Sequence, residues 1–361
     1  MPDIGIKKSL QLRDIIPSDV EEVARFIGRL SGSEMPLSVA LERLSWILLE
    51  NPARTAGDPL GWLLRNSSGE LVGCMCCAPQ KFCIGQSTFT LLMANSFYVD
   101  DRFRGAGTSI FLKYLQMGRR YPLFVSSANP TVAAMWQKLG GYQLGNSDHE
   151  ELGILRWPPM LAESVYRKTG NARLARITSA IASPLFGASR RLPLGSAEGE
   201  LVPLESAEQA AATSSQHHSG KITNCRQAPF LKWRYFLQTK PLTRLFRFST
   251  GDGEKKQFMI AVQLQNRGYN QQIKALQVLD IWGEADPQTV VAIASCLWRE
   301  YCDQINLLAF RCLTPLQTRE LQAKGFKVRS FPAPIAWCID KYALLPSKDW
   351  HFVPADGDMF L

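Results

Sequence analysis

Residues 97–111 read FYVDDRFRGAGTSIF, and this stretch decides the expected fold. An apolar strand ends near Val99 and passes through Arg102–Gly107 (RFRGAG) into a helix with apolar residues at helical spacing. Glycines let a backbone approach closely, the first turn of a helix offers free N–H groups at its positive end, and arginines add charge. The stretch therefore predicts a site for a phosphate or pyrophosphate group.

The loop differs from two common phosphate-binding loops. It lacks the Gly-Lys-Ser/Thr of a P-loop, and its glycines do not follow the G-x-G-x-x-G spacing of dinucleotide-binding folds. Around it, periodicity and turn residues predict the order β-α-α-β-β-β-α-β-α-β up to about Trp157. That alternation indicates an α/β (α+β) fold with a mixed central sheet and helices on both faces.

Composition sets limits on size and partners. The chain has 361 residues, of which 46% are apolar, enough for two domains with substantial cores. The formal net charge of +9 favours an anionic partner: a phosphorylated cofactor, an acidic carrier protein, nucleic acid or an anionic membrane. No signal-peptide core and no run long enough to span a bilayer occur, and nine scattered cysteines indicate reduced thiols, so we expect a cytoplasmic protein.

Four cysteines lie close together, at Cys74, Cys76, Cys77 and Cys83. Metal sites of this kind use two C-x-x-C pairs, whereas Cys74 and Cys77 make a single pair with no second one after it, and no histidine is near. We interpret them as small residues on a buried strand and expect no metal.

Composition changes after about Pro158. The stretch VYRKTGNARLARITSAIASPLFGASRRLPLG contains six Lys/Arg and no acidic residue. Two interpretations are open, a basic amphipathic helix on a membrane surface or a connecting helix with a solvated face, and we favour the connecting helix. The predicted organisation is a first domain at 1–158, a basic linker or helix at 159–199 and a second domain at 200–361.

Two segments of the chain resemble each other, which indicates an internal duplication. The aligned pairs are Pro130 with Pro315, Gln137 with Gln322 and Gly140 with Gly325. The same offset places Pro287–Ala292 (PQTVVA) opposite Arg102–Gly107. Because the second copy has no glycine and no arginine there, only the first copy keeps the predicted anion site.

FYVDDRFRGAGTSIF and NPTVAAMWQKLGGY (129–142) resemble two characteristic segments of the GCN5-related N-acetyltransferase (GNAT) superfamily, the first being its acyl-CoA loop. The resemblance extends over roughly Leu10 to Arg156 and is weaker in the second half. It implies a mixed sheet of GNAT type in two tandem domains, the second degenerate, with acetyl-CoA or another acyl-CoA as cosubstrate.

The resemblance also implies which residues bind the coenzyme. The pyrophosphate would lie on the N–H groups of Arg104–Thr108, and the pantetheine arm would pair with the strand edge at 97–99. A backbone N–H near Tyr98 or Val99 would polarise the thioester carbonyl. The implied cofactor-binding residues are Phe97, Tyr98, Val99, Arg102, Arg104, Gly105, Ala106, Gly107, Thr108 and Asn129.

One departure concerns the proton donor to the leaving thiolate. Many members of the superfamily have a tyrosine where this chain has Trp136, and an indole cannot serve as that acid. The predicted catalytic residues are Tyr98, Asp100 and Tyr142, with Ser126, Ser127, or a water held by Asn95 and Ser96, as alternatives for proton transfer. Asp100 and Asp101 could instead cap the loop or pair with Arg102 and Arg104.

The function implied is an N-acyltransferase, most simply an N-acetyltransferase, in which the primary amine of a small molecule or sugar attacks acyl-CoA directly. A non-catalytic acyl-CoA-binding or regulatory protein is one alternative. A FemAB-like aminoacyl transferase that uses aminoacyl-tRNA is another, although such proteins lack this loop. An acidic acyl-carrier protein would suit the positive charge as a partner. We expect no specific nucleic acid, and membrane contact only if the basic stretch is a surface helix.

Overall fold

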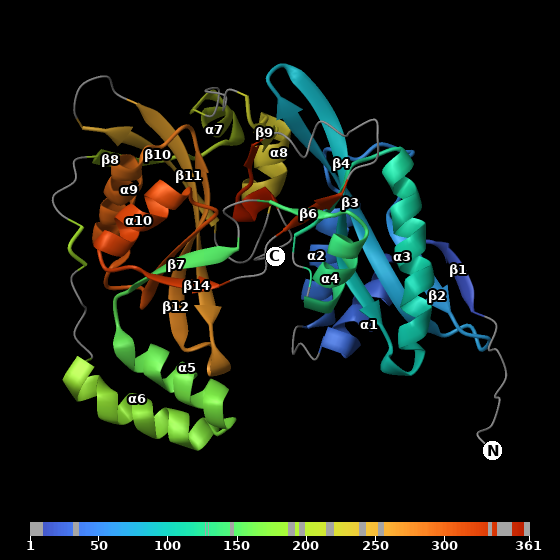
Figure 1. Ribbon diagram of the computed structural model, residues 1–361, viewed down its shortest axis with the longest axis horizontal. Helices are drawn as coiled ribbons and strands as arrows, with labels where there is room; N and C mark the ends of the chain where they lie inside the picture. Colours follow the sequence, from blue (N-terminus) through green and yellow to red (C-terminus); the bar gives the residue numbers. More distant parts are fainter. Residues whose placement is uncertain are drawn as a thin grey trace.

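The computed structural model describes residues 10–31, 36–126, 128, 130–144, 148–186, 192–194, 199–213, 220–237, 243–251, 256–330, 334–337 and 349–356. Two mixed sheets with covering helices lie side by side, and a pair of helices, α5 (Trp157–Thr169) and α6 (Ala172–Phe186), projects from one end (Figure 1). The predicted α+β fold with two mixed sheets is confirmed.

The first sheet has nine strands within the described residues. Its main order is β1 (Gln11–Asp14), β2 (Gly61–Arg65), β3 (Leu71–Ile84), β4 (Ser87–Val99), β5 (Leu123–Val125), β15 (Ile335–Trp337), β6 (Tyr142–Gln143). β9 (Ile222–Asn224) pairs with β3, and β16 (Trp350–His351) pairs with β9. β4 and β5 are parallel, whereas β3 and β4 form a long antiparallel hairpin.

The second sheet repeats this arrangement. Its order is β8 (Gly199–Pro203), β10 (Thr243–Thr250), β11 (Gln257–Arg267), β12 (Ile273–Trp282), β13 (Leu307–Arg311), β7 (His149–Ile154), β14 (Lys327–Ser330). β12 and β13 are parallel, as β4 and β5 are in the first sheet. The predicted duplication is therefore present as a repeated strand order.

The two sheets exchange a strand. The position between β5 and β6 is taken by β15, and the matching position between β13 and β14 is taken by β7. β15, which comes from the second half of the chain, thus lies in the first sheet, where pairing with β5 and β6 satisfies its backbone groups. The division at 1–158, 159–199 and 200–361 stays a prediction, and a cut between its parts would break main-chain ladders in both sheets.

Amphipathic helices cover the sheets and bury their apolar faces against them. In the first half they are α1 (Val20–Ser31), α2 (Leu37–Leu48), α3 (Gly107–Gln116) and α4 (Pro130–Lys138). In the second half they are α7 (Ala207–Thr213), α8 (Ala228–Leu231), α9 (Pro287–Tyr301) and α10 (Pro315–Ala323). Among the described helices, none is long and apolar enough to cross a bilayer.

The side chains of β4 alternate between two cores, which fixes the two sides of the site. Leu91 and Met93 belong to the core beneath α1 and α2, and Leu92 belongs to the core beneath α3 and α4. The four clustered cysteines all lie buried on β3, and burial raises the pKa of Cys76 to about 12. Within the described part of the chain, no group of acidic, histidine and cysteine side chains is arranged to hold a metal ion.

Candidate functional site

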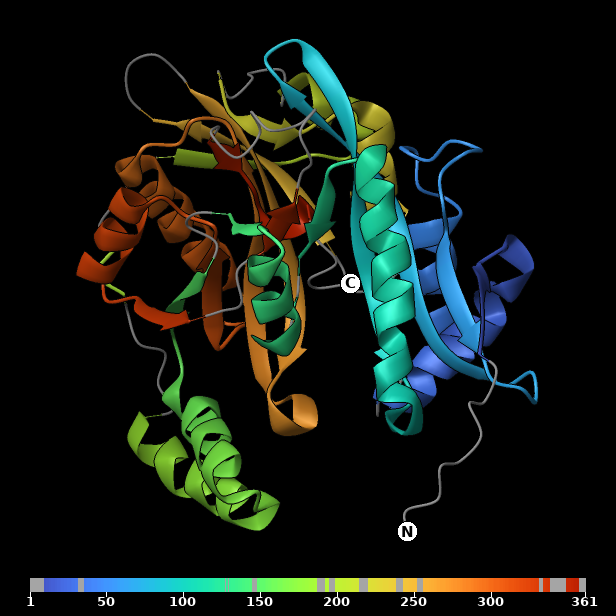
Figure 2. The same cartoon turned by 45° about the vertical axis from the view of Figure 1, so that its right-hand side comes forward.

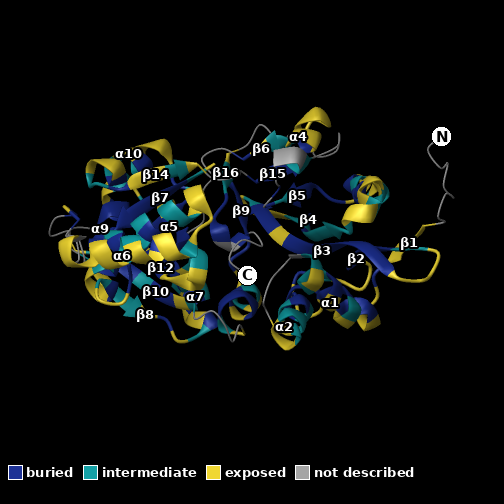
Figure 3. Cartoon of the chain, turned by 90° about the horizontal axis from the view of Figure 1, so that it is seen from below, coloured by how far each residue is buried: buried dark blue, intermediate teal, exposed yellow. Residues whose placement is uncertain are grey.

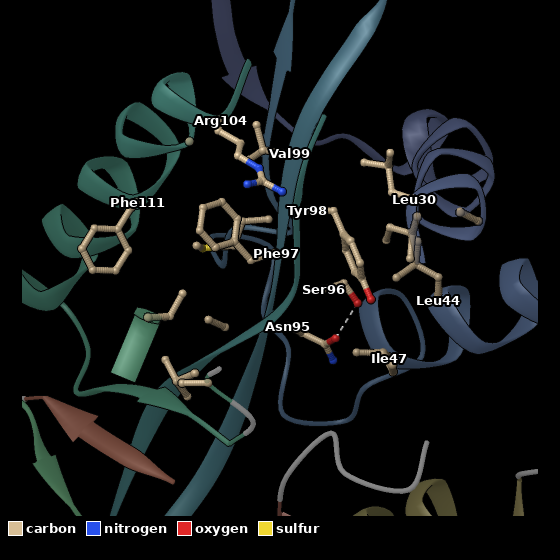
Figure 4. A pocket seen from close by; sticks show the side chains of 18 of the residues that line it. Leu30, Leu44, Ile47, Asn95, Ser96, Phe97, Tyr98, Val99, Arg104 and Phe111 are labelled. Carbon is tan, nitrogen blue, oxygen red and sulfur yellow. Dashed lines mark hydrogen bonds between the residues drawn. The ribbon is translucent and has the colours of Figure 1, made fainter. Parts of the chain in front are cut away.

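A cavity of about 1070 Å³ lies where β4 separates from β5. The parallel pairing of these strands ends at Ala94 and Val125, and β4 continues to Val99 with that edge unpaired among the described strands. Figure 4 shows β4 running through the site with α3 on one side and α1 and α2 on the other. The cavity therefore reaches both faces of the sheet through the gap.

A β-bulge shapes the strand beside this gap. Ser96 and Phe97 together oppose the single residue Met75, because the register of β3 and β4 shifts by one residue there. Ser96 takes the left-handed conformation, with φ of 52°, which is uncommon for a residue other than glycine. Strain of this kind is concentrated at functional sites.

The bulge reverses the direction of the backbone N–H groups. The N–H of Leu92 donates to Pro122 on the β5 side, whereas that of Asp100, eight residues on, donates to Val72 at the β3 side. In a regular strand, the N–H groups of two residues an even number of positions apart, such as 92 and 100, point to the same side. After the bulge, the N–H groups of Phe97 and Val99 face the open edge and that of Tyr98 faces β3. Of the two amides predicted to polarise a thioester, the geometry favours Val99.

The cavity has two arms. Figure 4 shows Phe97 and Val99 directed toward α3, and Ser96 and Tyr98 toward α1 and α2. The α3/α4 arm is lined by Phe97, Val99, Arg104, Gly107, Thr108, Phe111 and Trp136. The α1/α2 arm is lined by Ile27, Leu30, Ala40, Arg43, Leu44, Ile47, Asn95, Ser96 and Tyr98.

The structure brings most, but not all, of the predicted coenzyme residues to the cavity. Phe97, Tyr98, Val99, Arg104, Gly107 and Thr108 line it. Arg102, Gly105 and Ala106 belong to the preceding 3-10 helix (Asp101–Ala106) and do not line it. Asn129 and Ser127 lie outside the described residues.

Some hydrogen-bonding groups of the loop before α3 are bonded to other groups of the same loop. The Asp100 carboxylate accepts from the N–H of Arg102 at 3.0 Å, and the N–H of Gly107 donates to the Arg104 carbonyl. Asp100 also pairs with Arg102 at 2.9 Å, and Asp101 pairs with Arg104 at 2.8 Å. The acidic residues therefore cap the loop and pair with its arginines, which is the alternative role considered for them.

These contacts make Asp100 a weaker base. Hydrogen bonds from Arg102 hold the pKa of the Asp100 carboxyl low, at about 2. Asp100 does not line the cavity. A carboxylate with so low a pKa is a weak base at neutral pH.

The two glycines of the loop have different roles. A Cβ on Gly107 would lie 3.0 Å from Val99 Cγ2 and 3.4 Å from Phe97 Cζ, so glycine lets α3 approach the bulged strand. A Cβ on Gly105 would meet nothing within 4 Å. Neither glycine has a left-handed φ, so close approach at Gly107 is the reason for glycine here.

Among the predicted catalytic residues, Tyr98 alone lines the cavity. Tyr142 lies half-buried on β6 and packs against the core beneath α1 and α2. Trp136 is buried edge-on against Phe111 and Tyr114, at ring-centroid distances of 5.1 and 5.8 Å. Tyr114 donates its hydroxyl to the Leu92 carbonyl, and burial raises its pKa well above the usual value, so it acts in packing.

Asn95 is a buried polar residue on the cavity wall. It is 5% exposed, and Ser96 Oγ donates to its Oδ1 at 2.7 Å. Its Nδ2 has no hydrogen-bond partner among the described residues. A buried polar group with an unpaired end is rare and calls for an explanation, and its place beside the bulge suggests a role with a ligand.

The sequence did not indicate the residues of the α1/α2 arm. Ile27, Leu30, Leu44 and Ile47 follow the same helical periodicity as core residues, and part of each helix face does pack in the core. Periodicity alone cannot separate a side chain that lines a cavity from one that fills a core.

Among its described residues, the second copy offers no equivalent anion site. Its helix α9 begins at Pro287, and the Asp286 side chain accepts from the Thr289 N–H at 2.8 Å, so the helix start is capped internally. Beside the matching bulge in β12, the buried Arg226 bridges Asp280 at 2.8 Å and Asp356 at 2.7 Å. The smaller cavity there, about 280 Å³, is lined by charged groups of which Asp280 is already paired.

No protein-family model matches the sequence, and no curated protein matches it. Solved structures do match the fold. A probable N-acyltransferase from Enterococcus faecalis has a TM-score of 0.57 at 8% identity, over 92% of this chain and 73% of that chain. A GCN5-related N-acetyltransferase from Anabaena variabilis has a TM-score of 0.53 at 13% identity, over 92% and 74%. Saccharomyces cerevisiae N-myristoyltransferase with bound myristoyl-CoA has a TM-score of 0.52 at 11% identity, over 92% and 84%. The chain therefore has the fold of the GCN5-related N-acetyltransferases, in its two-domain form.

Proposed function

We propose that the protein is an acyl-CoA N-acyltransferase that acts on a primary amine in a ternary complex. The observation that carries this proposal is the bulged edge of β4, which turns two N–H groups toward a cavity that passes between β4 and β5. An acyl thioester placed there would have its carbonyl oxygen beside these donors. The amine nitrogen attacks the carbonyl carbon, the carbon–sulfur bond breaks, and the amine proton ends on the thiolate.

The donor would enter along the α3/α4 arm. The free edge of β4 at 97–99 is suited to pair with the amides of the pantetheine arm as an added strand would. Arg104, whose side chain is 77% exposed, and Thr108 lie on the same arm and suit the diphosphate. Binding of the diphosphate by the loop amides requires the contacts of Asp100 and Gly107 to rearrange, whereas Arg104 has to give up only its solvent-exposed pair with Asp101.

The acceptor, or a longer acyl chain, would occupy the α1/α2 arm. The lining residues that α1 and α2 contribute to this arm include no acidic one, and most are aliphatic. The carboxylate that lines the cavity, Asp101, precedes α3 and is paired with Arg104. The wall formed by α1 and α2 offers no carboxylate to stabilise an ammonium ion, so the amine would react in its neutral form and carry apolar groups. Sugar amines with many hydroxyl groups fit this arm less well than aliphatic ones.

Tyr98 is the residue we assign to proton transfer. Its side chain lines the α1/α2 arm, while Trp136 has no acidic proton to give and Asp100 is held in pairs by Arg102. A phenol beside the gap would give its proton to the leaving thiolate and take up the proton that the amine loses, so the net transfer is from amine to thiol.

A second candidate is an acyl-CoA-binding protein without catalysis. Trp136 favours it, because the tyrosine expected at this position is replaced by a residue that packs. Release of free thiol from acyl-CoA in the presence of amines separates the two candidates, since a binding protein would release none.

The test combines binding and turnover. CoA and acyl-CoAs of increasing chain length should raise the melting temperature, with roughly 2.7 kcal/mol of stabilisation at 100 times Kd. Tyr98→Phe should lower the rate of thiol release at least tenfold and leave CoA binding intact, whereas Tyr142→Phe should do neither. No shift with any acyl-CoA would overturn the proposal, and equal rates for both variants would remove Tyr98 from the mechanism.

A further inference from the structure

The projecting pair of helices carries an unusual surface. Figures 1 and 2 show α5 and α6 extending from the body of the molecule, and Figure 3 shows exposed residues along α6. One face of α6 packs against its surroundings through Ala175 and Ala182, which are 0% and 5% exposed. The residues on the outer face are large and apolar. They are Leu174, Ile177, Ile181 and Leu185, which are 47%, 47%, 63% and 71% exposed.

These four side chains form one stripe, because their spacing of three or four residues returns to the same side of a helix. Single exposed apolar residues are common on soluble proteins, but a continuous patch marks an interaction surface. No other described helix carries as many exposed large apolar residues. We name Leu174, Ile177, Ile181 and Leu185 the α6 stripe.

The charges around the α6 stripe are of one sign. Arg173 and Arg176 are exposed on its flank, and Arg167 and Lys168 lie in the last turn of α5. The single acidic residue of 157–186 is Glu163, which is 9% exposed and pairs with Arg167 at 2.6 Å. An apolar stripe flanked by arginines, without an exposed carboxylate, is typical of helices that lie in the interface of anionic membranes.

We propose that α6 binds the surface of an anionic lipid bilayer, with the α6 stripe at the boundary of headgroups and acyl chains and the arginines on lipid phosphates. A second copy of this chain is the less suitable occupant. Two such stripes packed together would bring the like charges of Arg173 and Arg176 from both copies close to each other. This inference does not depend on the proposed acyltransferase activity.

Co-sedimentation of the full chain with vesicles tests the proposal. Vesicles of one part phosphatidylglycerol to two parts phosphatidylcholine should bind the protein, those of phosphatidylcholine alone should bind it weakly, and salt should reduce binding. Ile181→Asp should reduce partitioning by roughly 10- to 100-fold, the range expected when one large aliphatic side chain no longer inserts. Arg173→Gln should reduce it roughly fivefold.

The matched control is Leu316→Asp on α10, since Leu316 is also 63% exposed and is outside the stripe. It should bind vesicles as the unaltered chain does. Because Ile181 is exposed, Ile181→Asp should keep its circular dichroism and melting temperature, and Ile181→Ser is a second variant if it does not.

Three results would overturn the proposal. The unaltered chain could fail to bind anionic vesicles at low salt, or Ile181→Asp and Ile181→Ser could bind as it does. Light scattering could instead show a dimer that Ile181→Asp dissociates, which together with no vesicle binding would assign the stripe to contact between copies.

Discussion

Replacing Asn95 by leucine should stabilise the free protein and impair the proposed reaction. Asn95 is 5% exposed, and one end of its amide has no partner among the described residues. An unpaired buried polar group costs about 1–3 kcal/mol of folding free energy, and leucine has the same branched shape, with the same number of side-chain heavy atoms, without that cost. A residue retained at such a cost is expected to serve a ligand or the reaction.

The expected magnitude follows from two opposing changes. Removal of the unpaired end regains about 1–3 kcal/mol, and loss of the bond from Ser96 Oγ to Asn95 Oδ1 costs about 0.5–1.5 kcal/mol. Ser96 is half-buried, so part of that loss is recovered through water. The net gain in the free energy of unfolding is therefore between about 0 and 2.5 kcal/mol, an increase in melting temperature of up to a few degrees.

Gln80→Leu is the matched control. Gln80 is 3% exposed on the neighbouring strand, and its Oε1 accepts from Asn224 Nδ2 at 3.1 Å. Leucine there leaves the Asn224 donor unpaired, so this variant should lose about 1–3 kcal/mol. The substitutions Asn95→Leu and Gln80→Leu are thus expected to change the free energy of unfolding in opposite directions.

Urea unfolding of the free protein and thiol release from acyl-CoA provide the measurements. If Asn95→Leu lowers stability as Gln80→Leu does, the Asn95 amide is satisfied in the free protein and the argument fails. If its turnover equals that of the unaltered chain, Asn95 has no part in the reaction.

Three further changes test other parts of the structure. Gly107→Ala should cost about 1–3 kcal/mol through contact with the bulged strand and weaken CoA binding severalfold by calorimetry, whereas Gly105→Ala should change neither. Arg104→Glu should weaken CoA binding at least tenfold, while Lys113→Glu, off the cavity on the following helix α3, should not. Arg226→Met should lower the urea stability by about 3–5 kcal/mol, since two buried carboxylates lose their counter-charge.

Each of these has a result that contradicts it. Equal effects of the two glycine variants would show that close approach of α3 is unimportant. Equal CoA affinity for the two charge reversals would place the diphosphate elsewhere. A fully stable Arg226→Met chain would show that the buried carboxylates take up protons at little cost.

Much of the fold could be predicted from the sequence because the relevant patterns are local. Helical and alternating periodicity marked the elements, and the offset between Pro130 and Pro315 revealed the repeat that the two strand orders display. The stretch from Phe97 to Thr108 was correctly placed at the end of a strand and the start of a helix, and most of the coenzyme residues predicted from it line the cavity.

The sequence alone determined where the strands and helices lie, that one unit is repeated and that one copy carries the glycine loop. The tertiary structure decided the exchange of β7 and β15, the bulge at Ser96, the internal pairing of Asp100, and the exposure of the α6 stripe. Strand pairing and burial depend on partners far away in the chain, and a local pattern is the same whether its apolar face meets a core, a cavity or solvent.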